Sequence, residues 1–197
     1  MREPREPLEL RVRKGSVLEA LPEPLLPGEK RQLGRLTIWI QDELGDASAK
    51  RIYRAAGSDG ASYAYKEARD ASAIAKEEER TLALVGKVPV ARVMQTGQGS
   101  DVHWILREWI VGFDGEAWLA LHADGEAPDE SRREDLRRFL SSAIALGLEI
   151  GKLEPENLVW REGTWHVVEC GKIRQTTPEQ ARARYEKKFL KRWGFLP

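Results

Sequence analysis

The stretch that decides the fold lies late in the chain and reads Ile150-Gly-Lys-Leu-Glu-Pro-Glu-Asn-Leu-Val-Trp160, followed shortly by Trp165-His-Val-Val-Glu-Cys-Gly-Lys172. The turn pair Glu162-Gly163 separates two runs rich in apolar and β-branched residues, a pattern typical of two short strands. Taken alone, Pro155 and Asn157 are ordinary turn formers. Asn157 is nevertheless the only asparagine of the chain, so its place in this loop indicates a role beyond turn formation.

The pattern on either side of this stretch predicts alternating groups of strands and helices. The first 30 residues hold five prolines and read as an extended arm, with a short strand-like alternation at Leu8, Leu10 and Val12. The predicted elements after it are strands at 36–40, 49–54, 61–67, 88–94, 102–110, 153–160 and 164–168, and helices at 73–85, 132–146 and 177–193.

The quoted stretch resembles the catalytic loop of protein kinases and aminoglycoside phosphotransferases, His-Gly-Asp-Leu-x-Pro-x-Asn-Leu-Val, with the Asp-Phe-Gly or Asp-Trp-Gly motif that follows it. The matching residues are Leu153, Pro155, Asn157, Leu158, Val159 and Gly171. The resemblance implies an α+β, minimal bilobal protein-kinase-like fold with an antiparallel N-lobe sheet of five strands and a truncated helical C-lobe. The chain is short, as in RIO-type and small archaeal-type kinases.

The resemblance also implies an ion pair in the N-lobe. Lys66, in the third strand, matches the lysine that holds nucleotide phosphates and pairs with a glutamate of the next helix. That helix carries three glutamates in a row, Glu77 to Glu79. We expect Glu78 to be the partner, because Leu82 and Val85 follow it at the apolar helix positions.

The remaining implied site residues concern ATP and magnesium, which are the cofactors of the family. Glu108 to Ile110 match the hinge backbone that contacts the nucleotide base, and Asn157 and Glu169 match the two magnesium ligands. Glu169 stands where the family has aspartate. These ligands are expected only if nucleotide binding is retained.

Several departures argue against catalysis. Lys152 replaces the catalytic aspartate, Ile150 the loop histidine, and Glu154 brings negative charge where active members carry a cation or histidine. Arg107 stands just before the hinge, at a normally apolar position where a guanidinium is costly to bury without partners. No glycine-rich loop lies between the first two predicted strands. We therefore expect an inactive, pseudokinase-like module.

Composition restricts the alternatives. The 197 residues carry 32 basic and 32 acidic side chains, so no net charge attracts nucleic acid or membranes. The one cysteine, Cys170, and three scattered histidines predict neither an intrachain disulfide nor a zinc site. No apolar stretch approaches a membrane span, and a reducing cytoplasm is the expected location.

The C-terminal helix is the second feature of interest. Tyr185, Phe189 and Trp193 stand four residues apart and predict a stripe that packs on the small lobe. Basic residues predominate elsewhere on this helix, and we expect them to face solvent; they are Arg184, Lys187, Lys188 and Lys191. This basic face is either a solvated helix surface or a contact for nucleic acid or an acidic partner.

The sequence thus predicts an arm at 1–30, an N-lobe at 31–110 and a truncated C-lobe at 111–197. Three functions remain open. The first is an inactive kinase-like module that binds an unidentified protein partner. The second is a divergent ATP-dependent phosphotransferase, and the third is a nucleic-acid-associated module that uses the basic helix.

Overall fold

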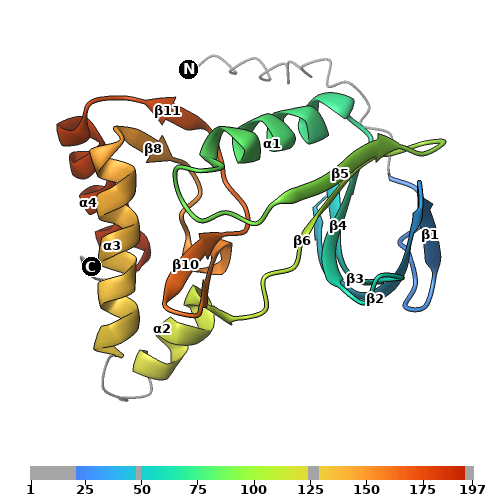
Figure 1. Ribbon diagram of the computed structural model, residues 1–197, viewed down its shortest axis with the longest axis horizontal. Helices are drawn as coiled ribbons and strands as arrows, with labels where there is room; N and C mark the ends of the chain where they lie inside the picture. The colour runs from blue at the N-terminus through green and yellow to red at the C-terminus, as the bar shows by residue number, and fades with distance from the viewer. Residues whose placement is uncertain (1–20, 48–49, 124–128, 194–197) are drawn as a thin grey trace, which may run out of the picture.

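The computed structural model describes residues 21–47, 50–123 and 129–193, and the strand-like alternation near the N-terminus lies outside them. Figure 1 shows two parts: a curled sheet with helix α1 (Ala71–Leu84) beside it, and a part that contains α2 (Gly115–Ala123), α3 (Glu130–Ala145) and α4 (Pro178–Arg192). The polypeptide passes between them after strand β6 (His103–Glu108), and the later elements belong to the second part.

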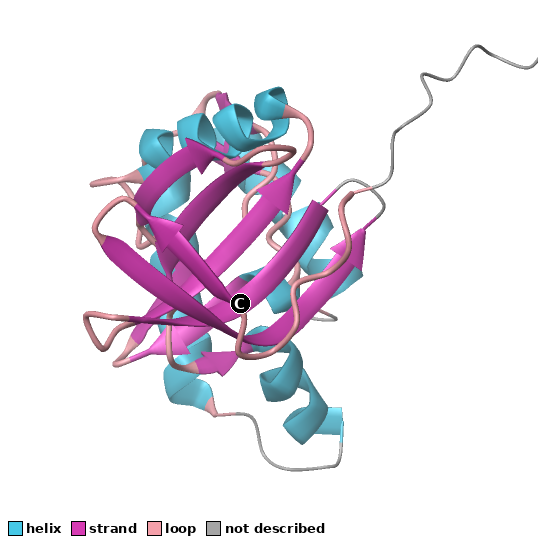
Figure 2. Cartoon of the chain, turned by 90° about the vertical axis from the view of Figure 1, so that its right-hand side faces the viewer, coloured by secondary structure: helices cyan, strands magenta, loops and turns pink. Residues whose placement is uncertain are grey.

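The first part is an antiparallel sheet of six strands in the order β1-β2-β3-β4-β6-β5. Its bounds are β1 Lys30–Leu33, β2 Leu36–Ala47, β3 Lys50–Gly57, β4 Ser62–Ala68, β5 Val93–Gln98 and β6 His103–Glu108. The sheet curls strongly (Figure 2), and register shifts in β2 between Ile40 and Asp42 and between Glu43 and Gly45 assist the curl. The expectation of five strands was wrong because β1 adds a sixth, formed by residues that the sequence places between the arm and the first predicted strand.

Alternation along β4 gives the sheet two different faces. Ala64 and Lys66 face a cavity between the two parts, whereas Tyr65 and Glu67 face the inside of the curl. This follows from the period of two in a strand, where successive side chains point to opposite faces. The inside of the curl holds the apolar core of this part, which includes Ile38, Tyr53 and Leu106.

Helix α1 (Ala71–Leu84) crosses the sheet (Figure 1) and begins at Asp70, whose carboxylate accepts a hydrogen bond of 2.8 Å from the Ser72 backbone N–H. Its buried stripe is Ile74, Glu77, Thr81 and Leu84. The Thr81 hydroxyl is satisfied by the Glu77 carbonyl. One ionisable residue therefore lies in the middle of a buried helix face, which requires a partner.

The second part packs three helices around short strands. Its elements are β7 Phe113–Asp114, α2 Gly115–Ala123, α3 Glu130–Ala145, β8 Leu148–Ile150, the 3-10 turn η1 Pro155–Asn157, β9 Leu158–Arg161, β10 Thr164–Val167, β11 Ile173–Gln175 and α4 Pro178–Arg192. Its core centres on Trp118, Trp165 and Trp193, whose ring centroids lie 5.7 to 6.2 Å apart. Tyr185 and Phe189 are buried in the same core, so the predicted aromatic stripe of the last helix is present.

The predicted strand at 88–94 is the main error in the element assignment. Strand β5 begins only at Val93, and the preceding residues pair with the second part instead: Val90 forms a parallel bridge with Val167, and the Ala91 N–H donates to the Val167 carbonyl at 2.9 Å. Val88 and Val90 are buried in the core of the second part. Their alternating apolar pattern correctly predicted an extended conformation. The segment, however, pairs with β10 of the second part and not with the six-stranded sheet.

Helix α2 was not predicted. Asp114 initiates it by accepting a hydrogen bond of 2.7 Å from the Ala117 N–H, a capping pattern that the sequence contains but that the short apolar run after it obscures. No helix in the described ranges is long and apolar enough to cross a bilayer.

Candidate nucleotide-type cleft

A cavity of about 290 Å³ lies between the two parts, at the place where the sequence motifs converge. We call it the cleft. Its lining comes from the sheet, α1, the 108–112 connection, η1 and the segment after β10; the residues are Leu44, Ile52, Ala64, Lys66, Glu77, Ala91, Arg107, Glu108, Trp109, Ile110, Gly112, Asp114, Glu156, Asn157, Val159, Val168 and Glu169. The predicted hinge and the predicted magnesium ligands thus share one cavity with Lys66.

Two loops pack closely next to Glu169, which lines the cleft. The Gly171 N–H donates to the Gly151 carbonyl at 2.8 Å, and the Gly151 N–H donates to the Lys172 carbonyl at 3.1 Å. A Cβ at Gly171 would lie 3.0 Å from the Lys152 Cγ and 3.2 Å from the Gly151 backbone carbon. This position therefore tolerates little beyond glycine, which explains the Gly171 match in the sequence.

The glutamate that pairs with Lys66 is Glu77, so the prediction of Glu78 was wrong. Lys66 Nζ lies 2.6 Å from Glu77 Oε2, and both side chains are buried. Glu78 lies one residue further round the helix and instead receives 3.4 Å contacts from the Thr96 hydroxyl. The error came from treating Leu82 and Val85 as the buried face, whereas both are more than half exposed.

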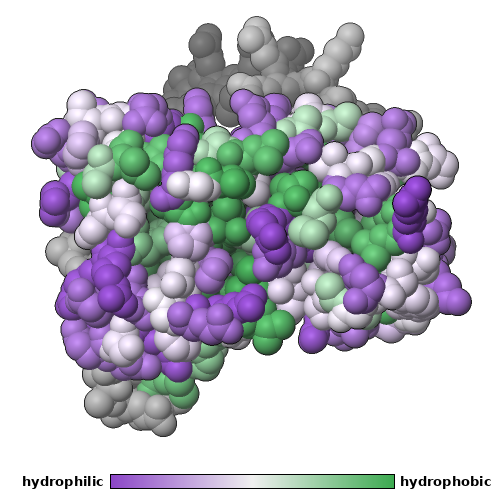
Figure 3. All heavy atoms as spheres, viewed as in Figure 1, coloured by the Kyte–Doolittle hydropathy of each residue, from purple (hydrophilic) through white to green (hydrophobic). Residues whose placement is uncertain are grey.

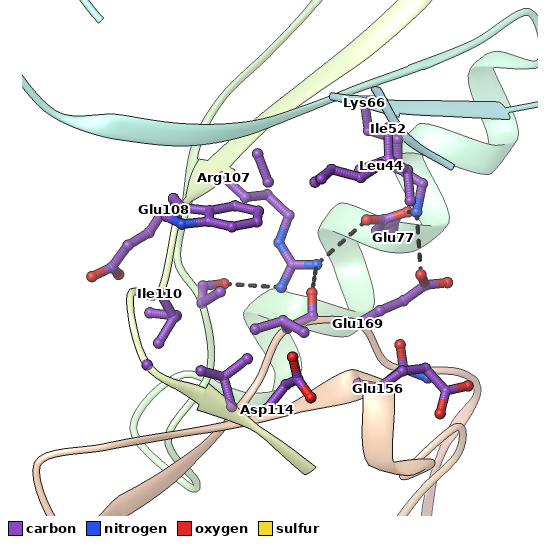
Figure 4. A pocket seen from close by; sticks show the side chains of 17 residues that line it. Leu44, Ile52, Lys66, Glu77, Arg107, Glu108, Ile110, Asp114, Glu156 and Glu169 are labelled. Atoms are coloured by element: carbon purple, nitrogen blue, oxygen red, sulfur yellow. Dashed lines mark hydrogen bonds and ion pairs between the residues drawn. The ribbon is translucent and has the colours of Figure 1, made fainter. Parts of the chain in front are cut away.

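Arg107 fills the part of the cleft next to the 108–110 connection. Only 4% of this residue is exposed, and Figure 4 shows its guanidinium pointing inward towards Glu77. It donates to Glu77 Oε1 at 3.4 Å, to the Ala91 carbonyl at 3.0 Å and to the Val168 carbonyl. The cost of burying it is therefore offset by a carboxylate and two carbonyls.

Lys152 forms an ion pair with Glu169, one of the residues that line the cleft. Its ammonium lies 2.7 Å from Glu169 Oε1, while Lys66 Nζ lies 3.9 Å from Glu169 Oε2. The hydrogen bond that Lys152 donates to Glu169 raises the pKa of Lys152. Burial alone would raise the pKa of Glu169, but the charge of Lys66 and the hydrogen bond from Lys152 outweigh it and lower that pKa. Glu169 is thus an ionised carboxylate whose two oxygens face ammonium groups.

These contacts form one chain of alternating charge across the cleft, in the order Lys152, Glu169, Lys66, Glu77 and Arg107. The two cationic ends stand where the family resemblance implies an aspartate and an apolar residue. Each carboxylate is shared by two cations. The three cations and two carboxylates of this series together carry one net positive charge.

The cationic neighbours of Glu169 oppose the binding of a magnesium ion. Asn157 lines the cleft, but Glu169 is held by two lysines, and a divalent cation would have to displace Lys152 against like-charge repulsion. Within the described residues, no cluster of three or more histidine, cysteine or acidic side chains could hold a metal. Magnesium binding by Asn157 and Glu169 stays a prediction, and no chemical step is assigned to it.

Sequence reasoning missed Lys50 as a neighbour of this site. It lies on β3, and burial followed by the charge of Lys66 lowers its pKa. Lys50 is followed on β3 by Arg51, which is nine-tenths buried on the other face of the sheet. The alternation of the strand therefore indicates that Lys50 points to the face that carries Lys66. Lys66 and Lys152 contact Glu169, and the charge of Lys50 also lowers the pKa of this carboxylate.

Comparisons with known proteins agree with this fold. Among solved structures, the chain is similar to the kinase domain of BubR1, with a TM-score of 0.59 and 12% identity over 80% of this chain and 53% of that one. It is also similar to the autoinhibited serine kinase domain of the giant muscle protein titin, with a TM-score of 0.53 and 17% identity over 70% of this chain and 46% of that one. No protein-family model matches, and the search of curated proteins finds no significant relative.

The fold is therefore a protein-kinase-like one, as the sequence motifs predicted. The chain spans about half the length of these kinase domains. In that reduced fold the first part is the N-lobe and the second the C-lobe, and we use these names from here on.

Proposed function

We propose that the protein is a catalytically inactive kinase-like module that acts by binding a protein partner. The observation that carries the proposal is the ion pair of 2.7 Å between Lys152 and Glu169. It places an ammonium where phosphoryl transfer requires a carboxylate to orient the acceptor, and it engages the carboxylate that would hold the metal.

Arg107 supports the same proposal from the other end of the cleft. Its guanidinium occupies volume beside the 108–110 connection, where a base would have to lie, and three acceptors hold it there. A nucleotide would have to displace a buried charge from its partners before it could bind. This cost lowers the affinity for any nucleotide whose base lies beside the 108–110 connection.

The partner-binding half of the proposal draws on α1. Leu82 and Val85 are exposed, and Figure 3 shows apolar side chains at the surface over the end of this helix. The helix carries Glu77 on its opposite face and so connects this surface to the cleft. In this proposal, the protein partner covers Leu82 and Val85. The proposal places the module in the cytoplasm, in keeping with the single buried Cys170.

The test is nucleotide binding and transfer by the intact chain. We expect about 1 mM ATP with magnesium to leave the melting temperature unchanged within error, since only a ligand that binds the folded state raises it. Incubation with γ-labelled ATP should give no labelled product. A thermal shift of several degrees, or label transfer above that of a heat-denatured sample, would overturn the proposal.

A variant pair makes this test sharper. Arg107→Leu removes the guanidinium and should create measurable ATP affinity. Arg92→Leu serves as the control, because Arg92 is exposed and does not line the cleft, although its partner Glu108 does. If Arg107→Leu stays folded and gains no affinity, Arg107 is not what excludes the nucleotide.

A divergent ATP-dependent phosphotransferase is the second candidate, and the buried Lys66–Glu77 pair of 2.6 Å favours it. This pair is the arrangement that active kinases need. Lys50, Lys66 and Lys152 could neutralise phosphates without a metal. ATP binding that persists in excess chelator would support this candidate over the first.

A further inference from the structure

A second cavity, of about 560 Å³, opens on the inner side of the curled sheet, away from the cleft. We call it the sheet cavity. Its walls are β1, β4, the turn between β5 and β6, and residues 22–25. The two ends of the sheet approach each other here, since a Cβ at Gly34 would lie 3.6 Å from the Gln95 side-chain nitrogen. The mouth of a curled or closed sheet is a recurrent ligand site.

Glu67 lies in the wall of this cavity and is only 5% exposed. Its Oε1 accepts a hydrogen bond of 3.0 Å from the Tyr65 hydroxyl. Across the described ranges 21–47, 50–123 and 129–193, no cation comes within ion-pair distance of it. Glu77 is equally buried but has Lys66 and Arg107 as partners. Glu67 is thus a buried carboxylate that faces a cavity and lacks a counter-ion.

The electrostatic environment of Glu67 agrees with this description. Burial raises its pKa, and the Tyr65 hydrogen bond with the more distant charges of Arg31 and Arg51 offsets only part of the effect. The other charged residues that line the cavity are Glu23, Asp101 and Arg31. Arg51 stands opposite Glu67 in the register of β3 and β4. Among the described residues, three carboxylates therefore face two guanidinium groups, which leaves one negative charge in excess.

Aromatic rings form the wall beside the carboxylate. Tyr65 and Trp104 both line the cavity, and their ring centroids are 6.1 Å apart. Aromatic faces attract cations, and a guanidinium stacks on them better than an ammonium does. A carboxylate beside aromatic rings in a partly enclosed space is therefore complementary to a planar organic cation with an apolar stem.

We propose that the sheet cavity binds an alkylguanidinium group, with the cation on Glu67 and its stem along Tyr65 and Trp104. The group belongs either to an external ligand, such as an arginine side chain of a peptide, or to the chain itself, whose first 13 residues include four arginines. The guanidinium supplies the charge that Glu67 lacks. The site is independent of the cleft and of whether the cleft binds nucleotide.

Calorimetric titration with n-butylguanidinium tests the site, with neutral n-butylurea as the matched probe. We expect the cation to bind and the urea not to bind. Glu67→Gln, which keeps the size and an acceptor for Tyr65, should weaken binding about tenfold or more, because a charged acceptor becomes neutral. Glu156→Gln is the matched control, since Glu156 is exposed in the cleft, and it should change nothing.

A second arm identifies the source of the guanidinium. In the full-length chain with Arg2, Arg5, Arg11 and Arg13 changed to serine, stronger probe binding identifies an internal arginine as the natural occupant. Unchanged binding identifies an external ligand. Absence of binding in both the wild-type and the serine-substituted chains would overturn the proposal, as would binding that Glu67→Gln leaves intact.

Discussion

At the scale of single residues, one helical step separates the expected partner of Lys66 from the real one. Glu77 is buried with two cations, whereas Glu78 meets only a hydroxyl. The sequence offers three adjacent glutamates, and only the orientation of α1 distinguishes them. That orientation depends on tertiary packing, because the polar Thr81 takes a buried position that hydrophobic pattern assigns to leucine.

The difference between these neighbours gives the first prediction. Glu77→Gln should lower the melting temperature by about 10 °C, because breaking a buried pair costs about 3–5 kcal/mol and each kcal/mol shifts a chain of this size by about 2–4 °C. Glu78→Gln, the control, should stay within about 1 °C. Scanning calorimetry measures both, and equal effects would contradict the assignment.

Glu67 gives a prediction of opposite sign. Its pKa is raised on folding from an ordinary value of 4.5, so its contribution to stability is fully present below that value and is lost as pH rises through the raised one. Glu67→Gln should therefore raise the melting temperature at about pH 7 and give no gain at about pH 4. A gain that does not depend on pH would show that packing, rather than ionisation, is responsible.

At the scale of elements, α4 combines a buried aromatic stripe with basic residues that are only partly free. Arg184 and Lys188 contact Glu149, and Arg174 lies 3.7 Å from the same carboxylate. Arg184 and Lys187 are exposed as expected, whereas Lys188 is only half-buried rather than fully in solvent. The side chain of Lys191 lies outside the described residues.

Glu149 gives a third prediction, which concerns the proposed nucleic-acid contact. Burial would raise the pKa of Glu149, but hydrogen bonds from Arg184 and Lys188 hold it below its ordinary value, so this carboxylate stays charged and competes with phosphates for the same cations. Any RNA or DNA affinity should fall steeply with salt and should increase in Glu149→Gln. Filter binding at about 50 mM salt measures it. Absence of binding by both proteins would end the nucleic-acid proposal.

The sequence predicted most elements of the N-lobe sheet because strict alternation is a local signal. It also predicted α3 from its apolar spacing and α4 from the Thr177 cap, whereas the Asp129 cap of α3 was not recognised. It could not assign residues 88–91 to the C-lobe, because the sequence pattern of an extended segment does not show which sheet the segment joins. Within the site, it selected Lys66, Asn157, Lys152 and Glu169 by motif, but missed Lys50 and the three acceptors of Arg107, which only tertiary structure reveals.

At the scale of the whole molecule, the two lobes are joined by more than the 108–112 connection. The 88–91 segment pairs with β10, and Arg107 reaches from β6 to α1 and to the Ala91 and Val168 carbonyls. A buried guanidinium that binds groups from both lobes ties their relative position to its own hydrogen bonds. The lobes are therefore expected to unfold together.

This coupling can be measured. The wild-type protein should unfold in urea in one transition, with the same midpoint by fluorescence and circular dichroism. Arg107→Met keeps most of the volume but removes the hydrogen bonds, and it should lower the m-value because the lobes no longer unfold as one unit. An unchanged m-value with a lower midpoint would show that Arg107 stabilises the fold without coupling the lobes.

The backbone torsion of Lys152 affects which substitutions are favourable at this position during evolution. Lys152 has a φ of 59°, in the left-handed region that glycine, asparagine and aspartate enter more readily than lysine does. A codon change towards aspartate at this position would thus relax the backbone even as it removes the contact with Glu169. In a saturation library selected only for folding, small residues should be well represented at this position. Strong retention of lysine under selection for function would then measure how much the organism depends on its charge.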